Sequence, residues 1–279
     1  MTAPVRLPLG LLLSLSVVAC SLSDEEPATT STQPIVGGLE APSTAWRGAA
    51  ALYANGYQFC GGDLIADEWV ITAGHCVNAY YEDTGGVDRI VIGRHSLSSS
   101  EGEERVVDHA YRHESFNWQT LDYDIGLLHL SQRSTVPPSK LLTPALAARV
   151  VEGAGVTVVG WGSTAEGSPT SDVLRQVTLP VLSNEQCRTF PHYAGVNRDQ
   201  LCAGFVTGGY DACQADSGSP LFMTIDGEPY QVGIVSWGIG CARPGRPGVY
   251  TRLASYLGWV WTTTRGAAGA PPSAPAGTL

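Results

Sequence analysis

Three side chains that lie far apart in the sequence have the types needed for nucleophilic catalysis. They are a histidine, an aspartate and a serine, in the segments TAGHC (72–76), DYDIGLL (122–128) and DACQADSGSP (211–220). A serine hydroxyl is a weak nucleophile near neutral pH, so it needs a base such as an imidazole to take its proton. A buried carboxylate must then fix the tautomer of that imidazole and stabilise its cation. His75, Asp124 and Ser217 are therefore candidates for base, orienting acid and nucleophile in a site assembled by folding.

The remaining polar candidates have simpler interpretations. Asp122 is expected to be a solvated turn acid, and the histidines other than His75 are expected to be structural: His95, His109, His113, His129 and His192. A zinc centre built on cysteines is not indicated, because no two cysteines have the C-x-x-C spacing. We therefore expect no metal and no cofactor.

The elements that must position these residues are predicted to be short strands between turns. Many glycines and prolines, 33 and 18 respectively, with only 15% charged residues, favour a loop-rich globular protein over a disordered chain or a coiled coil. Two helices are expected, one opening with a capping box at Ser183 and Gln186 and one over 253–262. The stretch 136–144 is the expected connection between two halves. The predicted strands are 57–65, 69–72, 87–92, 125–130, 156–161, 173–181, 230–237 and 248–252.

The first 19 residues have the pattern of an export signal. Arg6 precedes the apolar run 7–18, which is too short to span a bilayer as a helix. The small residue Ala19 before Cys20 resembles the processing site of a bacterial lipoprotein, which predicts Cys20 as a lipid-modified N-terminus and the only membrane anchor. An ordinary signal peptide cut near Ala19 is the alternative. Both interpretations predict an exported protein, anchored at the cell envelope or secreted.

Composition also predicts the ends and the partners. Residues 20–34 are expected to form a disordered tether or propeptide, and 265–279 a disordered Ala/Gly/Pro tail, so that the globular part is 35–264. The formal net charge of −10 repels phosphate backbones, which argues against nucleic acid as a partner. A monomer is expected.

Taken together, the motifs resemble those of the trypsin-like serine proteases, in the family order His, Asp, Ser. The resemblance covers 35–264 and adds the segments IVGG (35–38), CGGDLI (60–65), GWG (160–162), SWG (236–238) and PGVYT (247–251). It implies an all-β fold of two six-stranded antiparallel barrels, over 35–144 and 145–264, with a C-terminal helix and the site in the cleft between the barrels. It also implies that His75, Asp124 and Ser217 hydrolyse peptide bonds through an acyl-enzyme.

The resemblance also implies how the cysteines pair. The expected bonds use every cysteine except Cys20: Cys60 with Cys76, Cys187 with Cys202, and Cys213 with Cys241. Each would contribute about 2 to 4 kcal/mol in a chain-entropy estimate. Disulfides of this kind persist in an oxidising, exported compartment.

The family resemblance also implies a substrate preference. Asp211 holds the family position at the floor of the specificity pocket, where a carboxylate selects a cationic side chain. Ala212 lacks the hydroxyl that many relatives have there, which should disfavour Lys relative to Arg. The expected partners are thus proteins or peptides with Arg or Lys, and protein inhibitors. The other expected substrate-binding residues are Gln214, Ser236, Trp237, Gly238 and Gly248.

Three departures from the family pattern affect these expectations. Ala215 replaces a glycine whose N–H, with that of Ser217, forms the oxyanion hole, so a strained loop would lower turnover. Ser219 replaces another usual glycine. Arg94 replaces a ligand in a loop that relatives use for calcium, which predicts an internal ion pair with Glu104 instead.

In relatives, a cut before the first residue of IVGG creates an ammonium that pairs with the acid beside the nucleophile. Here those residues are Ile35 and Asp216, and Pro34 stands where relatives carry Arg or Lys. The sequence thus predicts a zymogen of a protease that cleaves after Arg and, less well, Lys, and that does not activate itself. The alternatives are a binding protein whose catalysis is weakened by Ala215 and Ser219, and an esterase or amidase for small substrates.

Overall fold

A computed structural model describes residues 1–2, 35–78 and 83–271. The chain divides into two units, 1–32 and 33–279, and all the helices and strands of the described residues lie in the second. The expected signal, Cys20, the tether up to Pro34 and the last part of the tail lie outside the described residues. No helix among the described residues is long and apolar enough to cross a membrane.

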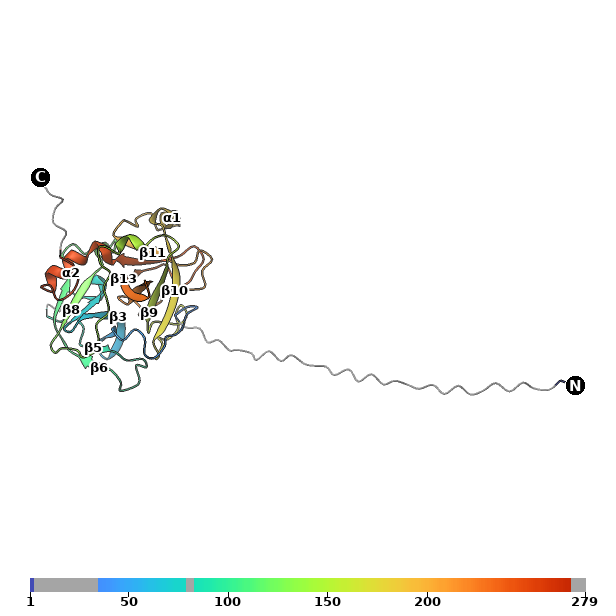
Figure 1. Cartoon of the computed structure of the whole chain (residues 1–279), viewed down its shortest axis with the longest axis horizontal. Helices are drawn as coiled ribbons and strands as arrows, with labels where there is room; N and C mark the ends of the chain where they lie inside the picture. Colours follow the sequence, from blue (N-terminus) through green and yellow to red (C-terminus); the bar gives the residue numbers. More distant parts are fainter. Residues whose placement is uncertain (3–34, 79–82, 272–279) are drawn as a thin grey trace. The chain divides into compact units, whose positions relative to one another are not determined.

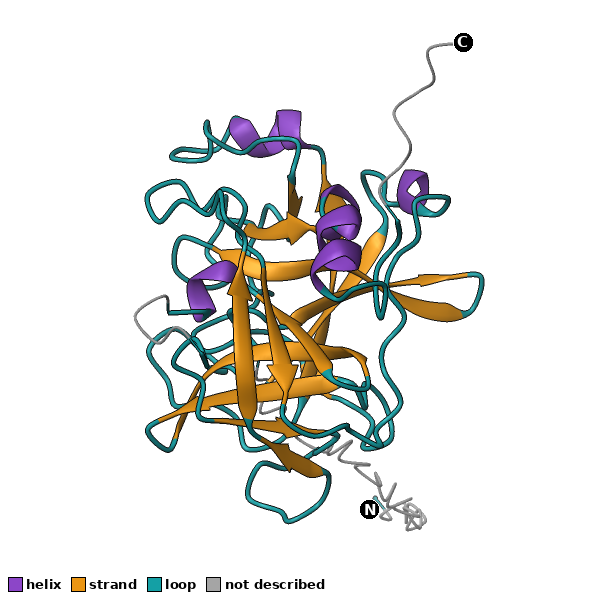
Figure 2. Ribbon diagram, turned by 90° about the vertical axis from the view of Figure 1, so that its left-hand side faces the viewer, coloured by secondary structure: helices purple, strands orange, loops and turns teal. Residues whose placement is uncertain are grey.

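The second unit consists mostly of antiparallel strands, and its helices are few and short (Figure 1, Figure 2). The all-β expectation is therefore confirmed. The strands are β1 (Leu39–Glu40), β2 (Ala49–Ala54), β3 (Tyr57–Ala66), β4 (Trp69–Thr72), β5 (Arg89–Ile92), β6 (Glu103–Arg105), β7 (Val107–Arg112), β8 (Gly126–Leu130), β9 (Gly155–Gly160), β10 (Arg175–Leu182), β11 (Gln200–Ala203), β12 (Pro220–Ile225), β13 (Glu228–Trp237) and β14 (Gly248–Arg252).

These strands form two sheets. The C-terminal sheet closes into a six-stranded barrel, because β9 pairs with both β10 and β12 around the order β10-β11-β14-β13-β12-β9. The N-terminal sheet has the order β6-β5-β2-β3-β4-β8-β7 and curls without a closing pair among the described strands. The second barrel thus has the expected six strands, whereas the first sheet has seven.

The chain start crosses to the other half of the molecule. Strand β1 pairs with β10, with Leu39 opposite Gln176, and the Ile35 side chain is buried in the core of the C-terminal barrel. We expected the whole of 35–144 in the N-terminal barrel, but its first residues lie on the C-terminal one. The cause is physical, since the exposed edge of β10 offers backbone hydrogen bonds and the barrel core offers apolar contacts.

A shared apolar layer joins the two sheets. It combines Ala51 of β2 and Val91 of β5 with Val159 of β9 and Phe222 of β12, and Trp46 stacks on Phe222 with ring centroids 4.6 Å apart. Burying these side chains between the sheets fixes how the two halves meet. The relative position of residues contributed by the two halves therefore follows from packing.

Two α-helices are present in the described chain. Helix α1 (Asn184–Arg188) starts as expected, with the Ser183 hydroxyl accepting the N–H of Gln186 at 3.3 Å. The expected helix 253–262 is divided into a 3₁₀ turn (Leu253–Ser255) and α2 (Leu257–Thr263), because Tyr256 between them is not helical. Helix α2 packs on the core of the N-terminal sheet.

Part of the expected tail is ordered. Residues 265–270 follow α2 and fold back on it, with the Ala270 N–H donating to the Leu257 carbonyl. The Thr264 hydroxyl and the Ala268 backbone also exchange hydrogen bonds of 3.1 Å. Because the hydroxyl of Thr264 satisfies this turn, small Ala and Gly residues pack closely there where composition alone predicted disorder.

Candidate active site

His75 and Asp124 are brought together by two adjacent strands. β4 ends at Thr72 opposite Gly126, the first residue of β8, so the turn that holds His75 lies beside the residue pair before β8. The Asp124 carboxylate is buried and accepts two hydrogen bonds of 2.8 Å, from the backbone N–H and from Nδ1 of His75. These two hydrogen bonds fix the orientation of the His75 ring and leave its Nε2 free to accept a proton.

The C-terminal barrel also holds Asp124. The Ser236 hydroxyl of β13 donates to Asp124 Oδ2 at 2.6 Å, and the Thr251 hydroxyl of β14 donates to its backbone carbonyl at 2.6 Å. An aspartate supplied by one sheet is therefore oriented by hydroxyls of the other.

Ser217 approaches the same place from the C-terminal barrel. Its carbonyl accepts the N–H of Gly61 in β3 at 2.7 Å. A Cβ atom at Gly218 would lie only 2.2 Å from Thr72 Oγ1 and 3.2 Å from the Ala73 nitrogen. The serine loop thus packs against the strand end that leads to His75. No hydrogen bond joins Ser217 Oγ to His75 among the described residues, and such bonds are often long or misaligned before substrate binds.

The loop before Ser217 accommodates Ala215 in a left-handed conformation. Ala215 has φ +68°, and the Asp216 N–H donates to the Cys213 carbonyl at 3.0 Å, as in a turn whose third residue needs positive φ. The Ala215 carbonyl accepts a bond of 3.0 Å from the Gln58 side chain. The turn is therefore intact, at a conformational cost of about 1 to 2 kcal/mol for a residue with a Cβ atom.

Ser219 is accommodated by glycines of neighbouring strands. It is buried, and a Cβ atom placed on Gly61 would lie 2.0 Å from Ser219 Oγ, with the corresponding distance from Gly160 at 3.0 Å. The added hydroxymethyl group therefore occupies space that these two glycines leave open.

Asp216 is buried without a cationic partner in the described chain. Its two oxygens accept the N–H groups of Gly162 and Cys213 at 2.8 and 2.9 Å. Burial raises the pKa of Asp216 to about 7, although these two hydrogen bonds act in the opposite direction. Ile35 is also buried, with φ +41°. No ion pair between them is present.

A cavity of about 240 Å³ lies beside Ser217. All the substrate-binding residues expected from the sequence line it: Asp211, Ala212, Gln214, Ser236, Trp237, Gly238 and Gly248. A Cβ atom at Gly248 would lie 3.0 Å from Asp211 Oδ1 and 2.8 Å from the Tyr250 hydroxyl, so glycine keeps the cavity open at the carboxylate. Sequence reasoning did not single out Tyr250, although it stands in the motif PGVYT.

The cavity has a buried acid. Asp211 is almost fully buried, and its Oδ2 accepts the N–H of Ala242 at 3.0 Å. Burial raises the pKa of Asp211 to about 7, while the N–H groups of Ala242 and Ala212 lower it and the charge of Asp216 raises it further. No cationic side chain of the described residues pairs with this carboxyl, and a cationic ligand would supply a counter-ion.

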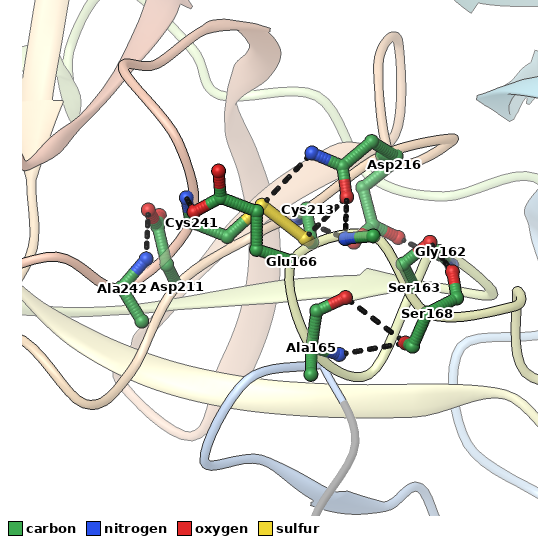
Figure 3. Close-up of a disulfide and its surroundings, with 12 residues drawn as sticks. Gly162, Ser163, Ala165, Glu166, Ser168, Asp211, Cys213, Asp216, Cys241 and Ala242 are labelled. Carbon is green, nitrogen blue, oxygen red and sulfur yellow. Dashed lines mark hydrogen bonds between the residues drawn. A yellow bond between two sulfur atoms is a disulfide. The ribbon is translucent and has the colours of Figure 1, made fainter.

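The loop that carries Ala242 is fixed from two sides (Figure 3). The Cys213–Cys241 disulfide joins it to the serine loop. The Glu166 carboxylate accepts the Cys241 N–H at 3.3 Å and the Arg243 Nε–H at 2.8 Å. Sequence reasoning missed the Glu166–Arg243 pair, which no local spacing indicates.

The other expected pairs are also present. The disulfides Cys60–Cys76 and Cys187–Cys202 complete the implied set. Arg94 Nη1 lies 3.3 Å from Glu104 Oε1 in an ion pair, and the largely buried guanidinium also donates from Nε to the Glu101 carbonyl at 2.5 Å. A second cavity, of about 830 Å³, adjoins His75 and Cys76 and extends to Trp118.

Comparisons with known proteins agree with this arrangement. The family model described as Trypsin matches residues 35–260. Trypsin-1 of Astacus astacus is 42% identical over 208 residues, which are 73% of this chain and 87% of that protein. Trypsin I-P1 of Gallus gallus is 36% identical, covering 88% of this chain and 93% of that protein. Trypsin 5G1 of Aedes aegypti is 37% identical, covering 90% and 96%.

Proposed function

Because the chain belongs to the trypsin family and is a trypsin-like serine endopeptidase, we propose that it hydrolyses peptide bonds after arginine and, less efficiently, after lysine. The observation that carries the proposal is the buried Asp211 carboxylate, which lines the cavity beside Ser217 and has no cationic partner in the part of the chain that the structure describes. An arginine side chain is long and permanently charged, so it would supply that counter-ion and make two hydrogen bonds in one plane.

The proposed reaction uses the three residues in sequence. Nε2 of His75 takes the proton of the Ser217 hydroxyl as Oγ attacks the substrate carbonyl. The same proton is then transferred to the leaving amine, which departs and leaves an acyl group on Oγ. Water attacks the acyl group with His75 again as base, which releases the acid and restores the serine. The hydrogen bond from His75 Nδ1 to Asp124 supports this cycle by stabilising the imidazolium.

The N–H groups of Ala215 and Ser217 are the proposed donors to the tetrahedral oxyanion. Support for this role comes from the turn at Ala215, which retains its internal hydrogen bond despite the added methyl group. A catalytically weakened binding protein would be favoured by a collapsed turn, and the described turn is intact.

The enzyme is proposed to prefer arginine over lysine because the cavity lacks a hydroxyl group at position 212. Ala212 offers no hydroxyl, and a lysine ammonium is shorter and depends more on added partners. The guanidinium reaches the carboxylate directly. Protein inhibitors that present an arginine or lysine to the same cavity are proposed as further partners.

Activation is proposed to require cleavage before Ile35. A cut there would remove the φ torsion of Ile35, whose value of +41° is a strained one for a β-branched residue. It would also create an ammonium as a partner for the buried Asp216 carboxyl. Because relatives carry Arg or Lys where this chain has Pro34, we propose that a proline-specific peptidase, and not the enzyme itself, makes the cut.

Export and anchoring complete the proposal. The three disulfides support an oxidising compartment outside the cytoplasm. If lipid is attached to Cys20, a cut before Ile35 would also release the enzyme from the membrane. No disulfide of the described chain reaches residues before Ile35, so activation and release would be one event.

The test uses protein that begins at Ile35, with Ser217→Ala and Asp211→Ser as variants. We expect a fluorophosphonate probe to label the parent protein and Asp211→Ser, but not Ser217→Ala. Arginyl anilide should be hydrolysed faster than lysyl anilide, and only Asp211→Ser should lose that preference. A binding protein would not be labelled, and an esterase for small substrates would be labelled but leave both anilides intact.

A further inference from the structure

Two histidines face each other across the last pair of strands in the N-terminal sheet. His109 of β7 lies directly opposite His129 of β8, and β7 is the edge strand of the sheet. Residues paired in this way have Cβ atoms about 4.5 to 5.5 Å apart. The ring centroids are 6.3 Å apart and the rings meet nearly at right angles. Imidazoles in this arrangement can share one small ligand.

A bulge adds a carboxylate to the pair. The register of β7 on β8 shifts between Val107 and His109, so Asp108 is an extra residue on that strand. Neighbouring side chains of a regular strand point to opposite faces, whereas a bulge re-aims them. As a result, Asp108 Oδ1 lies 2.6 Å from Nδ1 of His129 and 3.3 Å from Nδ1 of His109.

The three side chains of the group are only partly buried. The exposed fractions of the three side chains are 37% for Asp108, 63% for His109 and 28% for His129. The group is thus held in place and still reachable from solvent.

From this convergence of three donor atoms we propose that Asp108, His109 and His129 bind a divalent transition-metal ion of the Zn²⁺ class. One nitrogen of each ring and one carboxylate oxygen all lie within 4.8 Å of one another. Two imidazoles and a carboxylate match the ligand preference of Zn²⁺, with bonds of about 2.0 to 2.2 Å, and leave a position for water. Metal ligation uses the lone pair of a ring nitrogen, so any proton on that nitrogen must leave when the ion binds.

The other convergent group in the described chain does not offer the same ligands. Cys60, His75 and Cys76 also lie close together, but the two cysteines form a disulfide and have no thiolate to donate. The Asp108 group could not be recognised from the sequence, because His129 lies 20 positions from His109. Only the strand register joins them.

Metal binding would connect the edge strand β7 to β8. It would therefore stabilise the folded protein in proportion to ion concentration, since the unfolded chain lacks the site. Trp69 offers a spectroscopic reporter, because its ring meets that of His129 at a centroid distance of 4.8 Å. A paramagnetic ion such as Cu²⁺ at this site should quench its fluorescence.

The test uses the whole mature protein with Ser217→Ala, which prevents self-digestion. Zn²⁺ binding is measured by isothermal titration calorimetry, and Co²⁺ coordination by visible absorption. Added variants are His109→Asn, His129→Gln and Asp108→Asn, with His192→Asn as the matched control because His192 is an exposed histidine outside the group. His109→Asn is the decisive variant, since its exposed ring can be removed without opening the core.

We expect a single ion per chain for the parent protein and for His192→Asn, and a tetrahedral Co²⁺ spectrum from both. Each of the three site variants should weaken Zn²⁺ binding by roughly 100-fold or more, since even loss of a supporting contact costs 10- to 100-fold. Zn²⁺ should raise the melting temperature of the parent but not of His109→Asn. Equal Zn²⁺ affinity in the parent and in His109→Asn, or no binding by the parent, would overturn the proposal. Neither outcome depends on proteolysis.

Discussion

The Ser236 hydroxyl donates a hydrogen bond of 2.6 Å to Oδ2 of Asp124, the same oxygen that pairs with Nδ1 of His75 at 2.8 Å. Ser236 belongs to β13 of the C-terminal barrel, whereas His75 follows β4 and Asp124 precedes β8 of the N-terminal sheet. The orientation of the imidazole therefore depends on how the two halves dock, and the apolar layer around Trp46 and Phe222 sets that docking.

Asp124→Asn should lower kcat by roughly 10,000-fold, because an amide stabilises the wrong imidazole tautomer. Ser236→Ala should lower kcat by only about tenfold, since Asp124 keeps both bonds to His75 and loses one bond from a hydroxyl. Thr251→Val is the matched control, because it deletes a buried hydroxyl that contacts the Asp124 carbonyl and not its carboxylate. It should reduce stability and change kcat little. Steady-state kinetics on an arginyl anilide measure all three, and an equal loss in Ser236→Ala and Asp124→Asn would contradict this ranking.

Ala215→Gly should stabilise the protein by about 1 kcal/mol, because glycine adopts φ +68° without a Cβ clash. Its kcat should change less than about twofold, since the turn that presents the N–H groups is already formed. Ala145→Gly serves as control, since Ala145 is exposed and has no positive φ. That change should destabilise slightly through the entropy of the unfolded chain. Urea denaturation supplies the free energies of unfolding; a large rise in kcat for Ala215→Gly would mean that the alanine distorts the oxyanion loop.

The family resemblance implied a set of pocket residues from three distant segments, and all seven, Asp211 included, line one cavity. The local sequence at Ser183 was enough to predict the cap of α1. Contacts between distant segments that neither a family motif nor a local pattern marks had no sequence signal. Examples are the Glu166–Arg243 ion pair, the pairing of Leu39 with β10 and the bulge at Asp108. Such contacts depend on strand register and loop packing, which composition and local periodicity do not encode.

The uncut chain should lose stability as the pH rises from about 4 to about 7. Asp216 has a folded pKa of about 7, raised by burial from an ordinary value of 3.8, so the folded state binds the proton more tightly than the unfolded state over this range. Its contribution is fully present below the unfolded value and is lost as the pH passes the folded one. The pKa of Asp211 is also raised by burial to about 7, so Asp211 adds to the same loss of stability as the pH rises.

Denaturation curves between about pH 4 and about pH 7 would measure how steeply the free energy of unfolding falls with pH. The measurement is made on chains with and without the cut before Ile35. Asp216→Asn should flatten the slope of the uncut chain. In the cut chain the new ammonium should hold Asp216 ionised, so that its part of the slope disappears, while Asp211→Asn flattens the slope in both forms. An uncut chain whose slope is unaffected by Asp216→Asn would contradict the assignment.

Ala212→Ser should shift preference toward lysine. The added hydroxyl would give an ammonium a partner next to Asp211, whereas the guanidinium already makes two bonds to the carboxylate. We expect kcat/KM for a lysyl anilide to rise by roughly tenfold relative to the arginyl anilide, about the value of one hydrogen bond to a charged group. Ala49→Ser, in β2 of the other sheet and outside the cavity lining, is the control for a buried hydroxyl. If the ratio of kcat/KM for the lysyl and arginyl anilides does not change, the lysine ammonium does not contact residue 212.

Ser217 is proposed to cleave peptide bonds after the basic residues that Asp211 selects. Protein beginning at Ile35 can be incubated with a complex peptide library, and the new C-termini can be identified by mass spectrometry. We expect most cuts to follow arginine and fewer to follow lysine. Ser217→Ala should make none, and Asp211→Ser should lose the basic preference. Cuts by the parent that follow apolar or acidic residues as often as arginine, or cuts that persist in Ser217→Ala, would contradict it.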